Sequence, residues 1–206
     1  RELTFPFKRY QMQKCWRGER PQEGRFREFM QCDIDVVDQN EVSIEFDAEL
    51  PAIIYEIARK LNLPAVRIHI NNRKILQGFY EALGLDEAQI VEAIRIVDKL
   101  DKIYADGVSK SLKEELNLSD AQIESALSLA QIKTPDASFV EAVRALTSKT
   151  NTLLDEGLAE LELVMTRLAH IPSGHVLADM GIARGFDYYT GTCLLYTSDA
   201  ADEEDS

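Results

Sequence analysis

The sequence predicts an α+β fold, because the spacing of its apolar residues changes along the chain. From residue 9 to about residue 44, apolar and polar residues alternate in twos, which is typical of strands with one buried face. From residue 86 to about residue 170 the spacing becomes three and four, which is typical of amphipathic helices. Strand-like residues broken by glycines return in "HVLADMGIARGFDYYTGT", residues 175–192. At 206 residues, the chain can form one sizeable domain or a domain with an insertion.

The first predicted elements are two strands joined by a long loop. The runs "RYQMQKCW", residues 9–16, and "RFREFMQCDIDVV", residues 25–37, both alternate as strands do. In the second run one face, expected to be the core, holds Phe26, Met30, Cys32, Ile34 and Val36 with Glu28 as the exception. The opposite face is polar with a single aromatic ring, and it holds Arg25, Arg27, Phe29, Gln31, Asp33 and Asp35. The loop of residues 18–24 is longer than the roughly two to five residues usual for a hairpin, and long hairpin loops often bind a ligand.

A helix, a strand and a second helix are predicted next. The helical run "ELPAIIYEIARKLNL" starts near residue 50, and the β-branched run "AVRIHINN" follows Pro64. In residues 86–170, Ile90, Ile94 and Val97 share one helix face. Ser119 and Gln122 have capping-box spacing, so a helix is expected to begin there. This region shows no catalytic spacing, and we expect a helical insertion that packs on itself.

Composition excludes several classes of protein. The formal net charge of -13 argues against binding nucleic acid by net charge alone. The three cysteines have no Cys-x-x-Cys spacing and no histidine placed to complete a zinc site, so they are expected to be reduced thiols and no metal site is predicted. The sequence shows no membrane span and no signal-peptide pattern, which favours a cytoplasmic protein without a membrane partner.

The polar face of the second strand suggests a ligand site. Unpaired polar groups on a strand are costly unless they meet solvent, one another or a ligand. Phe29 offers a ring for a planar base, and Gln31 and Asp35 offer acceptors for an amine or a ring N–H. Arg17 and Arg25, at the ends of the loop, could hold a polyphosphate through bidentate contacts. The alternative from composition alone is a solvated, charged hairpin.

The run "WRGERPQEGRFREFMQCDID" closely resembles motif 2 of class II aminoacyl-tRNA synthetases, in the form found in the histidine-tRNA ligase family. The resemblance implies that Arg17 contacts the α-phosphate of ATP, that Glu19 and Arg25 contact ATP from the loop, and that Phe29 stacks on adenine. It also implies that Gln31 binds the α-amino group of histidine and that Asp35 takes an imidazole N–H. Asp33 shares this face without an implied role, and a structural or solvated position is expected for it.

The run "GIARGFDYYTG" resembles the histidine-specific motif of the same family, downstream of a helical insertion. The resemblance assigns Arg184 to the substrate carboxylate and the α-phosphate, and it assigns Tyr188 and Tyr189 to the histidine pocket. The alternative is a buried tyrosine pair in a sheet. His69, His170 and His175 lie outside both motifs and are expected to be structural or exposed.

The family resemblance covers residues 1–192 and implies the antiparallel sheet of a class II catalytic core, present in part. Residues 1–85 would form the first part of this core with motif 2, residues 86–170 the helical insertion, and residues 171–192 the second part of the core. The implied activity is ATP-dependent formation of histidyl-adenylate, assisted by Mg²⁺, and transfer to tRNA(His) by a homodimer. Motif 1, motif 3 and the anticodon-binding domain are missing, so this chain alone is expected to be inactive. The alternative is a non-catalytic, synthetase-like regulatory subunit of ATP phosphoribosyltransferase.

The last residues do not continue the pattern. "CLLYTSDAADEEDS", residues 193–206, resembles the translation of a sequencing adapter, and the alternative is a natural, acidic, disordered tail. On either interpretation this segment is expected to lie outside the fold.

Overall fold

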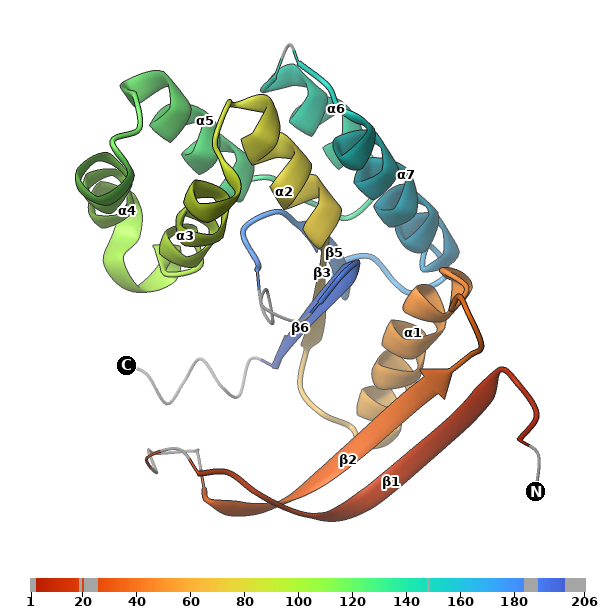
Figure 1. The fold of residues 1–206 in the computed structure, drawn as a ribbon. Helices are drawn as coiled ribbons and strands as arrows, with labels where there is room; N and C mark the ends of the chain where they lie inside the picture. The colour runs from red at the N-terminus through yellow and green to blue at the C-terminus, as the bar shows by residue number, and fades with distance from the viewer. Residues whose placement is uncertain (1–2, 19, 21–25, 148, 184–188, 199–206) are drawn as a thin grey trace. The chain divides into compact units, whose positions relative to one another are not determined.

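The computed structural model describes residues 3–18, 20, 26–147, 149–183 and 189–198 (Figure 1). Helices and strands are mixed, as the predicted α+β class requires. The chain forms two compact units, Arg1–Phe46 and Asp47–Ser206. The predicted boundaries after residues 85, 170 and 192 follow functional regions rather than these units, and they stay a prediction.

The first unit is built on an antiparallel hairpin of β1 (Phe7–Trp16) and β2 (Glu28–Val37). The pairing continues beyond both strands, because the Arg17 N–H donates to the Arg27 carbonyl at 2.9 Å. The predicted strand pattern extends to about residue 44, but β2 ends at Val37 and α1 (Glu45–Lys60) begins about five residues before the predicted start. Pro51 lies inside this helix.

The prediction that the apolar face of β2 forms a core is wrong. Side chains on this face of the hairpin are mostly exposed, including Tyr10 (77%), Met12 (67%) and Met30 (61%). The polar face of β2 is the half-buried one, and Gln31 and Asp33 lie on it. Alternation separates the two faces of a strand, but it does not determine which face becomes covered.

The second unit contains a four-stranded sheet in the order β4-β5-β3-β6. The central strand β3 (Val66–Asn72) pairs parallel with β5 (Val176–Asp179) and antiparallel with β6 (Thr192–Ser198). The two-residue strand β4 (Lys133–Thr134) pairs antiparallel with β5 and lies in the region predicted to be helical. Ile68 and Ile70 of β3 are fully buried, so this strand lies at the centre of the core.

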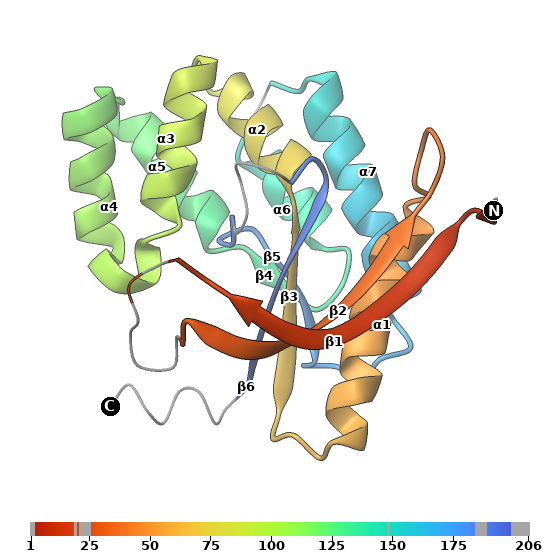
Figure 2. The same cartoon turned by 60° about the horizontal axis from the view of Figure 1, so that its bottom comes forward.

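The prediction that the chain leaves the fold after residue 192 is wrong for residues 193–198. These residues belong to β6, which lies along β3 from the Thr192 to Asn72 pairing to the Ser198 to Val66 pairing (Figure 2). Cys193 is buried, with 3% of its surface exposed. The run "TCLLYT" is rich in β-branched, aliphatic and aromatic residues, which suit a pleated strand. Residues 199–206 lie outside the described residues.

Five helices follow α2 (Arg73–Ala82), and their bounds are α3 (Glu87–Val97), α4 (Leu100–Leu116), α5 (Asp120–Ala130), α6 (Phe139–Ala145) and α7 (Thr152–Arg167). The predicted capping box is confirmed, since Ser119 and Gln122 exchange hydrogen bonds at the start of α5. Asp86 and Gln89 form a second capping box at the start of α3. Helices α3, α4 and α5 pack on one another, as expected of an insertion.

Helix α7 packs against α2 and β3, so by its contacts it groups with the core although the sequence placed it within the insertion. Two glycines allow the close approach of α2 and α7. A Cβ atom at Gly78 would lie 2.5 Å from the Leu154 nitrogen, and one at Gly157 would lie 2.7 Å from the Ile75 nitrogen. Any larger residue at either position would therefore push the helices apart.

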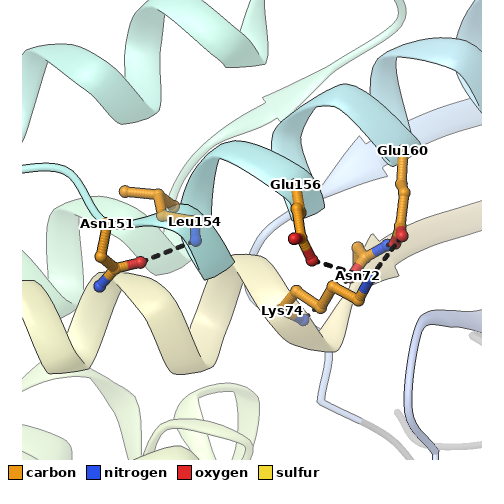
Figure 3. Close-up of polar contacts among 6 residues, drawn as sticks. All are labelled: Asn72, Lys74, Asn151, Leu154, Glu156 and Glu160. Atoms are coloured by element: carbon orange, nitrogen blue, oxygen red, sulfur yellow. Dashed lines mark hydrogen bonds and ion pairs between the residues drawn. The ribbon is translucent and has the colours of Figure 1, made fainter.

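A polar network joins the start of α2 to α7 (Figure 3). The fully buried Asn72 caps α2, because its Oδ1 accepts from the Lys74 N–H at 2.9 Å and its Nδ2 donates to Glu160 Oε2 at 2.8 Å. The Lys74 ammonium pairs with Glu160 and, at 3.3 Å, with Glu156. The hydrogen bond to Glu160 raises the pKa of Lys74. Asn151 caps α7 by accepting from the Leu154 N–H at 2.8 Å.

Candidate functional site

The predicted site residues fall into three groups. The hairpin of the first unit holds Arg17, Phe29, Gln31 and Asp35, all on one face or at its end. Tyr189 lies in the second unit. The predictions for Glu19, Arg25, Arg184 and Tyr188 lie outside the described residues.

Arg17 and Phe29 are brought together across the hairpin. The guanidinium carbon of Arg17 lies 4.6 Å from the centroid of the Phe29 ring, within the distance of a cation–π contact. Arg17 follows β1 directly and Phe29 is the second residue of β2, so the strand pairing sets their approach. The pair places a planar ring and a planar cation at the mouth of the loop. This combination suits a ligand with a flat base and a phosphate.

The side chain of Gln31 is hydrogen-bonded to Asp33, two positions further along β2. Its Nε2 donates to Asp33 Oδ1 at 2.8 Å, and the opposite strand adds a second donor, since Gln11 Nε2 donates to Asp33 Oδ2 at 2.9 Å. Each oxygen of the Asp33 carboxylate therefore accepts from a different glutamine. The Oε1 atom of Gln31 accepts no hydrogen bond from any residue that the structure describes, so it can accept one from a ligand.

Asp35 is paired with a cation from the opposite strand. Its Oδ2 lies 2.8 Å from Arg9 Nη2, and Arg9 Nη1 donates to Gln11 Oε1 at 3.1 Å. Asp35 Oδ2 is shielded from solvent and accepts no hydrogen bond of suitable geometry within the described residues, so the pairing with Arg9 is electrostatic. The contacts form one continuous polar chain across the hairpin, which runs through Asp35, Arg9, Gln11, Asp33 and Gln31.

The Asp33 carboxylate is stabilised in its ionised form. Hydrogen bonds from Gln11 and then from Gln31 lower the pKa of Asp33 below its usual range. An ionised carboxylate only accepts hydrogen bonds, so both glutamines must turn their NH₂ groups toward it. The orientation of both amides therefore follows from the chemistry of Asp33.

Sequence reasoning missed Arg9 and Gln11, and it gave Asp33 no role. The available signal was the register of the hairpin, which pairs three polar positions of β1 with three of β2: Arg9 with Asp35, Gln11 with Asp33, and Gln13 with Gln31. Side chains directly opposite on one face lie close enough to bond. A register could not be assigned to the two runs because the long loop leaves it open.

In the second unit, the segment with the histidine-specific motif is anchored at both sides. Arg73, the first residue of α2, donates from Nη1 to the Tyr189 carbonyl and from its backbone N–H to the Gly191 carbonyl at 2.8 Å. Tyr189 as a whole residue is 36% exposed. The end of the motif is thus fixed to the start of α2.

A buried carboxylate anchors the other side of the motif. Asp179, at the end of β5, is 1% exposed and contacts His69 Nδ1 at 2.8 Å and Lys133 Nζ at 3.1 Å. Its Oδ1 accepts from the Gly181 N–H at 2.9 Å. Burial acts to raise the pKa of Asp179, but the contacts with His69, Lys133 and Gly181 outweigh it, so the pKa is lowered.

The three histidines make local contacts, in keeping with their predicted structural or exposed character. The Nδ1 atom of His170 lies 2.9 Å from the Arg167 carbonyl, and that of His175 lies 2.8 Å from the Val66 carbonyl. His69 contacts Asp179. Each histidine thus joins neighbouring parts of the second unit.

Other features of the described residues are weaker candidates for a functional site than the hairpin. An open cavity of about 520 Å³ between α4 and α5, lined by residues such as Lys110, Lys113 and Glu124, contains none of the predicted site residues. Within the described ranges, the structure brings together no group of three His, Cys, Asp or Glu side chains able to hold a metal ion. No helix in this part of the chain has the length and hydropathy needed to cross a membrane.

The chain is similar over nearly its whole length to known proteins. The model of the family described as histidyl-tRNA synthetase matches residues 6–203. The histidine–tRNA ligase of Thermobifida fusca is 53% identical over 191 residues, which cover 93% of this chain and 43% of the relative. The chain therefore spans less than half the length of this relative.

Solved structures agree with the sequence relatives. The histidyl-tRNA synthetase of Nostoc sp. PCC 7120 has a TM-score of 0.87 and 35% identity, and the match covers all of this chain and 47% of that protein. An ATP phosphoribosyltransferase regulatory subunit/histidyl-tRNA synthetase from Bacillus halodurans has a TM-score of 0.78 over 95% of this chain and 49% of its own, but only 18% identity, so it shows the fold alone. On the family match across residues 6–203 and these relatives, the chain belongs to the histidyl-tRNA synthetase family.

Proposed function

We propose that this chain is the ATP- and histidine-binding part of a histidine-tRNA ligase. The observation that carries the proposal is the polar face of the hairpin. This face holds an arginine–phenylalanine pair at the loop end and two acceptors, Gln31 and Asp35, further along the same strand. The names of the relatives support the same reading, since histidine–tRNA ligases are 41–53% identical to this chain.

Each residue of this face has a role that suits its chemistry. The Phe29 ring would stack on adenine while Arg17 contacts the α-phosphate, and their 4.6 Å contact would hold the two groups in one orientation. The Oε1 of Gln31, which accepts no hydrogen bond within the described part of the chain, would accept from the α-ammonium group of histidine. The Asp35 carboxylate would accept from an imidazole N–H. Glu19 and Arg25 would contact ATP from the loop, and Tyr188 and Tyr189 would line the histidine pocket.

The proposed reaction joins two anions. An oxygen of the histidine carboxylate attacks the α-phosphorus of ATP, the bond from this phosphorus to the bridging oxygen breaks, and pyrophosphate leaves with the electron pair. Arg17 and Arg184 would offset the repulsion between the reactants and stabilise the charge that develops on the α-phosphate. The reaction needs no general base, because the attacking carboxylate is already ionised at neutral pH. The adenylate would then pass its histidyl group to tRNA(His).

Magnesium is expected with ATP in this family, where it would neutralise phosphate charge. Because the described residues offer no cluster of metal ligands, the steps above use only the side chains of this chain. A homodimer and a cytoplasmic location are proposed for the full-length protein on the family resemblance.

The alternative function is a regulatory subunit of ATP phosphoribosyltransferase. A neighbour whose title names such a subunit shares the fold at 18% identity. The catalytic proposal is favoured because Arg17, Gln31, Asp35 and Tyr189 are all present and the first three lie on one hairpin face or at its end.

Histidine-dependent exchange of pyrophosphate into ATP, by a full-length protein that contains these residues, tests the proposal. We expect exchange by the parent protein, and we expect Arg184→Ala to slow single-turnover adenylate formation by about 10²–10³-fold, as when one preorganised charge-stabilising donor is lost. Arg184→Lys should recover little, because an ammonium cannot reproduce a planar fork across two anions. Circular dichroism serves as the folding control. A folded parent protein without histidine-dependent exchange contradicts the proposal and favours the regulatory alternative.

A further inference from the structure

We propose that Asp33 is a positioning residue, which fixes the side-chain amide of Gln31 so that its Oε1 faces the α-amino group of the substrate. The inference rests on the proposed function of Gln31. It adds a residue that does not itself contact the substrate but determines which end of the Gln31 amide the substrate meets.

The reason lies in the symmetry of a glutamine side chain. Its oxygen and nitrogen ends are nearly equal in size, so shape alone does not orient the amide. A substrate ammonium group needs an acceptor, and the NH₂ end of Gln31 would repel it. Because Gln31 Nε2 donates to Asp33 Oδ1 at 2.8 Å, the acceptor end is the one left for the substrate.

Asp33 is itself held from the opposite strand. Gln11 donates to its second oxygen at 2.9 Å, and Arg9 fixes the amide of Gln11 by donating to Gln11 Oε1 at 3.1 Å. Both oxygens of Asp33 are therefore engaged, and the carboxylate cannot rotate without losing a hydrogen bond. The hairpin register places Gln11 directly opposite Asp33, so backbone pairing supports this arrangement.

The positioning role requires the ionised carboxylate of Asp33, because both of its oxygens must accept hydrogen bonds. An asparagine at this position has one acceptor end and one donor end, so it cannot accept from both glutamines. One of the two amides would have to turn over. Gln11 is held in place by Arg9, whereas Gln31 has no second partner among the described residues, so Gln31 is the amide that turns.

The test compares Asp33→Asn, Gln31→Ala and the double variant in a full-length protein that contains these residues. With Asp33→Asn we expect the KM for histidine to rise about tenfold, the size expected when a hydrogen bond to a charged group is lost. The KM for ATP and kcat should stay within about twofold, because the α-amino group keeps its charge throughout the reaction and is bound equally in the ground and transition states. In the Gln31→Ala background, Asp33→Asn should change the histidine KM by less than about twofold.

A second readout separates positioning from a general loss of structure. Imidazolepropionate, which lacks the α-amino group, should inhibit the parent protein and the Asp33→Asn variant with similar constants. Gln11→Met in the Asp33→Asn background provides an independent variant, because the asparagine then has to accept only from Gln31, so the histidine KM should return toward the parent value. Glu28→Gln is the matched control. Glu28 also accepts from two β1 side chains, Lys14 Nζ and Trp16 Nε1, but on the opposite face of the same hairpin.

The outcomes distinguish this inference from the proposed function. A rise in histidine KM with Gln31→Ala but not with Asp33→Asn would overturn the positioning role and leave the proposed function intact. An equal effect of Asp33→Asn with and without Gln31 would also overturn it, because Asp33 would then act directly or through the fold. If the parent protein shows no histidine-dependent exchange, the proposed function fails first, and the inference fails with it.

Discussion

The guanidinium of Arg17 lies over the ring of Phe29, with 4.6 Å between the guanidinium carbon and the ring centroid. One residue follows the end of β1 and the other lies near the start of β2, so the hairpin brings the proposed phosphate-binding cation and the proposed base-stacking ring to one place. The pair joins the two halves of the proposed ATP contact. Its ring and its cation can be removed separately.

Replacing Phe29 by leucine should weaken ATP binding while leaving histidine binding unchanged. Stacking of a base on an aromatic ring is worth about 1–3 kcal/mol, so we expect the KM for ATP to rise about tenfold. Phe29→Tyr is the control, since it keeps the ring and should stay within about twofold of the parent. The measurement is pyrophosphate exchange at saturating histidine. Equal KM values for the leucine and tyrosine variants would show that the ring does not contact the base.

Removing the Asp35 carboxylate should affect histidine and not ATP. Its Oδ2 already pairs with Arg9, so Asp35→Ala removes the proposed acceptor for the imidazole and also leaves Arg9 without its carboxylate partner. We expect kcat/KM for histidine to fall about 10²-fold, in the range for a lost hydrogen bond to a charged group. Asp38→Ala is the matched control, because Asp38 lies just beyond β2 and its Oδ1 accepts from the neighbouring Gln39 N–H at 2.8 Å. If both variants use histidine equally well, Asp35 does not accept a hydrogen bond from the imidazole.

Local features of the fold could be predicted from the sequence. The capping box of Ser119 and Gln122 and the order helix, strand, helix around β3 depend on residues near one another in the chain, and the structure confirms both. The short strand β4 was missed, because two residues give no periodicity and β4 exists only through pairing with β5. The burial of Cys193 was missed for the same reason, since it depends on pairing with β3.

The residues of the candidate site also divide into those that could be predicted from the sequence and those that could not. Gln31 and Asp35 could be placed on one face because a strand has a period of two. Their partners Gln11 and Arg9 could not be assigned, because the partners depend on the register of two strands separated by a long loop. The role of Asp33 follows only from that register. Residues that support a site from another strand are thus harder to predict than the residues that face the ligand.

The stability of the chain should depend on the ionisation of Asp47, near the start of α1. Burial raises the pKa of Asp47 above its usual value of 3.8, the Thr192 hydroxyl partly opposes this, and the charge of Glu160 adds to it. The folded chain therefore holds this proton more tightly than the unfolded chain. As pH rises from about 3.8 through the raised pKa, the free energy of unfolding should fall because of this group.

Asp47→Asn removes this effect and should raise Tm at pH 7 by about 2 °C or more, with no difference from the parent near pH 3. Below pH 3.8 the carboxyl is protonated in both states, so the two proteins should then melt alike. Asp136→Asn is the control of opposite sign, because the Ser138 hydroxyl and N–H lower the pKa of Asp136. Thermal melts followed by circular dichroism at both pH values give the comparison. An equal or lower Tm for Asp47→Asn at pH 7 would contradict the expected cost.

The three cysteines should differ in their reaction with a thiol reagent, and this difference tests whether β6 forms. Cys32 is exposed and Cys15 is half-buried, whereas Cys193 is buried where β6 pairs with β3. Burial also raises the pKa of the Cys193 thiol to about 12, so little reactive thiolate is present at pH 8.

In the native chain we expect Cys32 to react first, Cys15 more slowly, and Cys193 only on unfolding in denaturant. Cys193→Ser should remove the protected thiol and leave the faster phases unchanged, while Cys32→Ser should remove the fastest phase. Reaction of Cys193 as fast as Cys32 would show that β6 is not formed, and that residues 193–206 lie outside the fold as the sequence alone predicted.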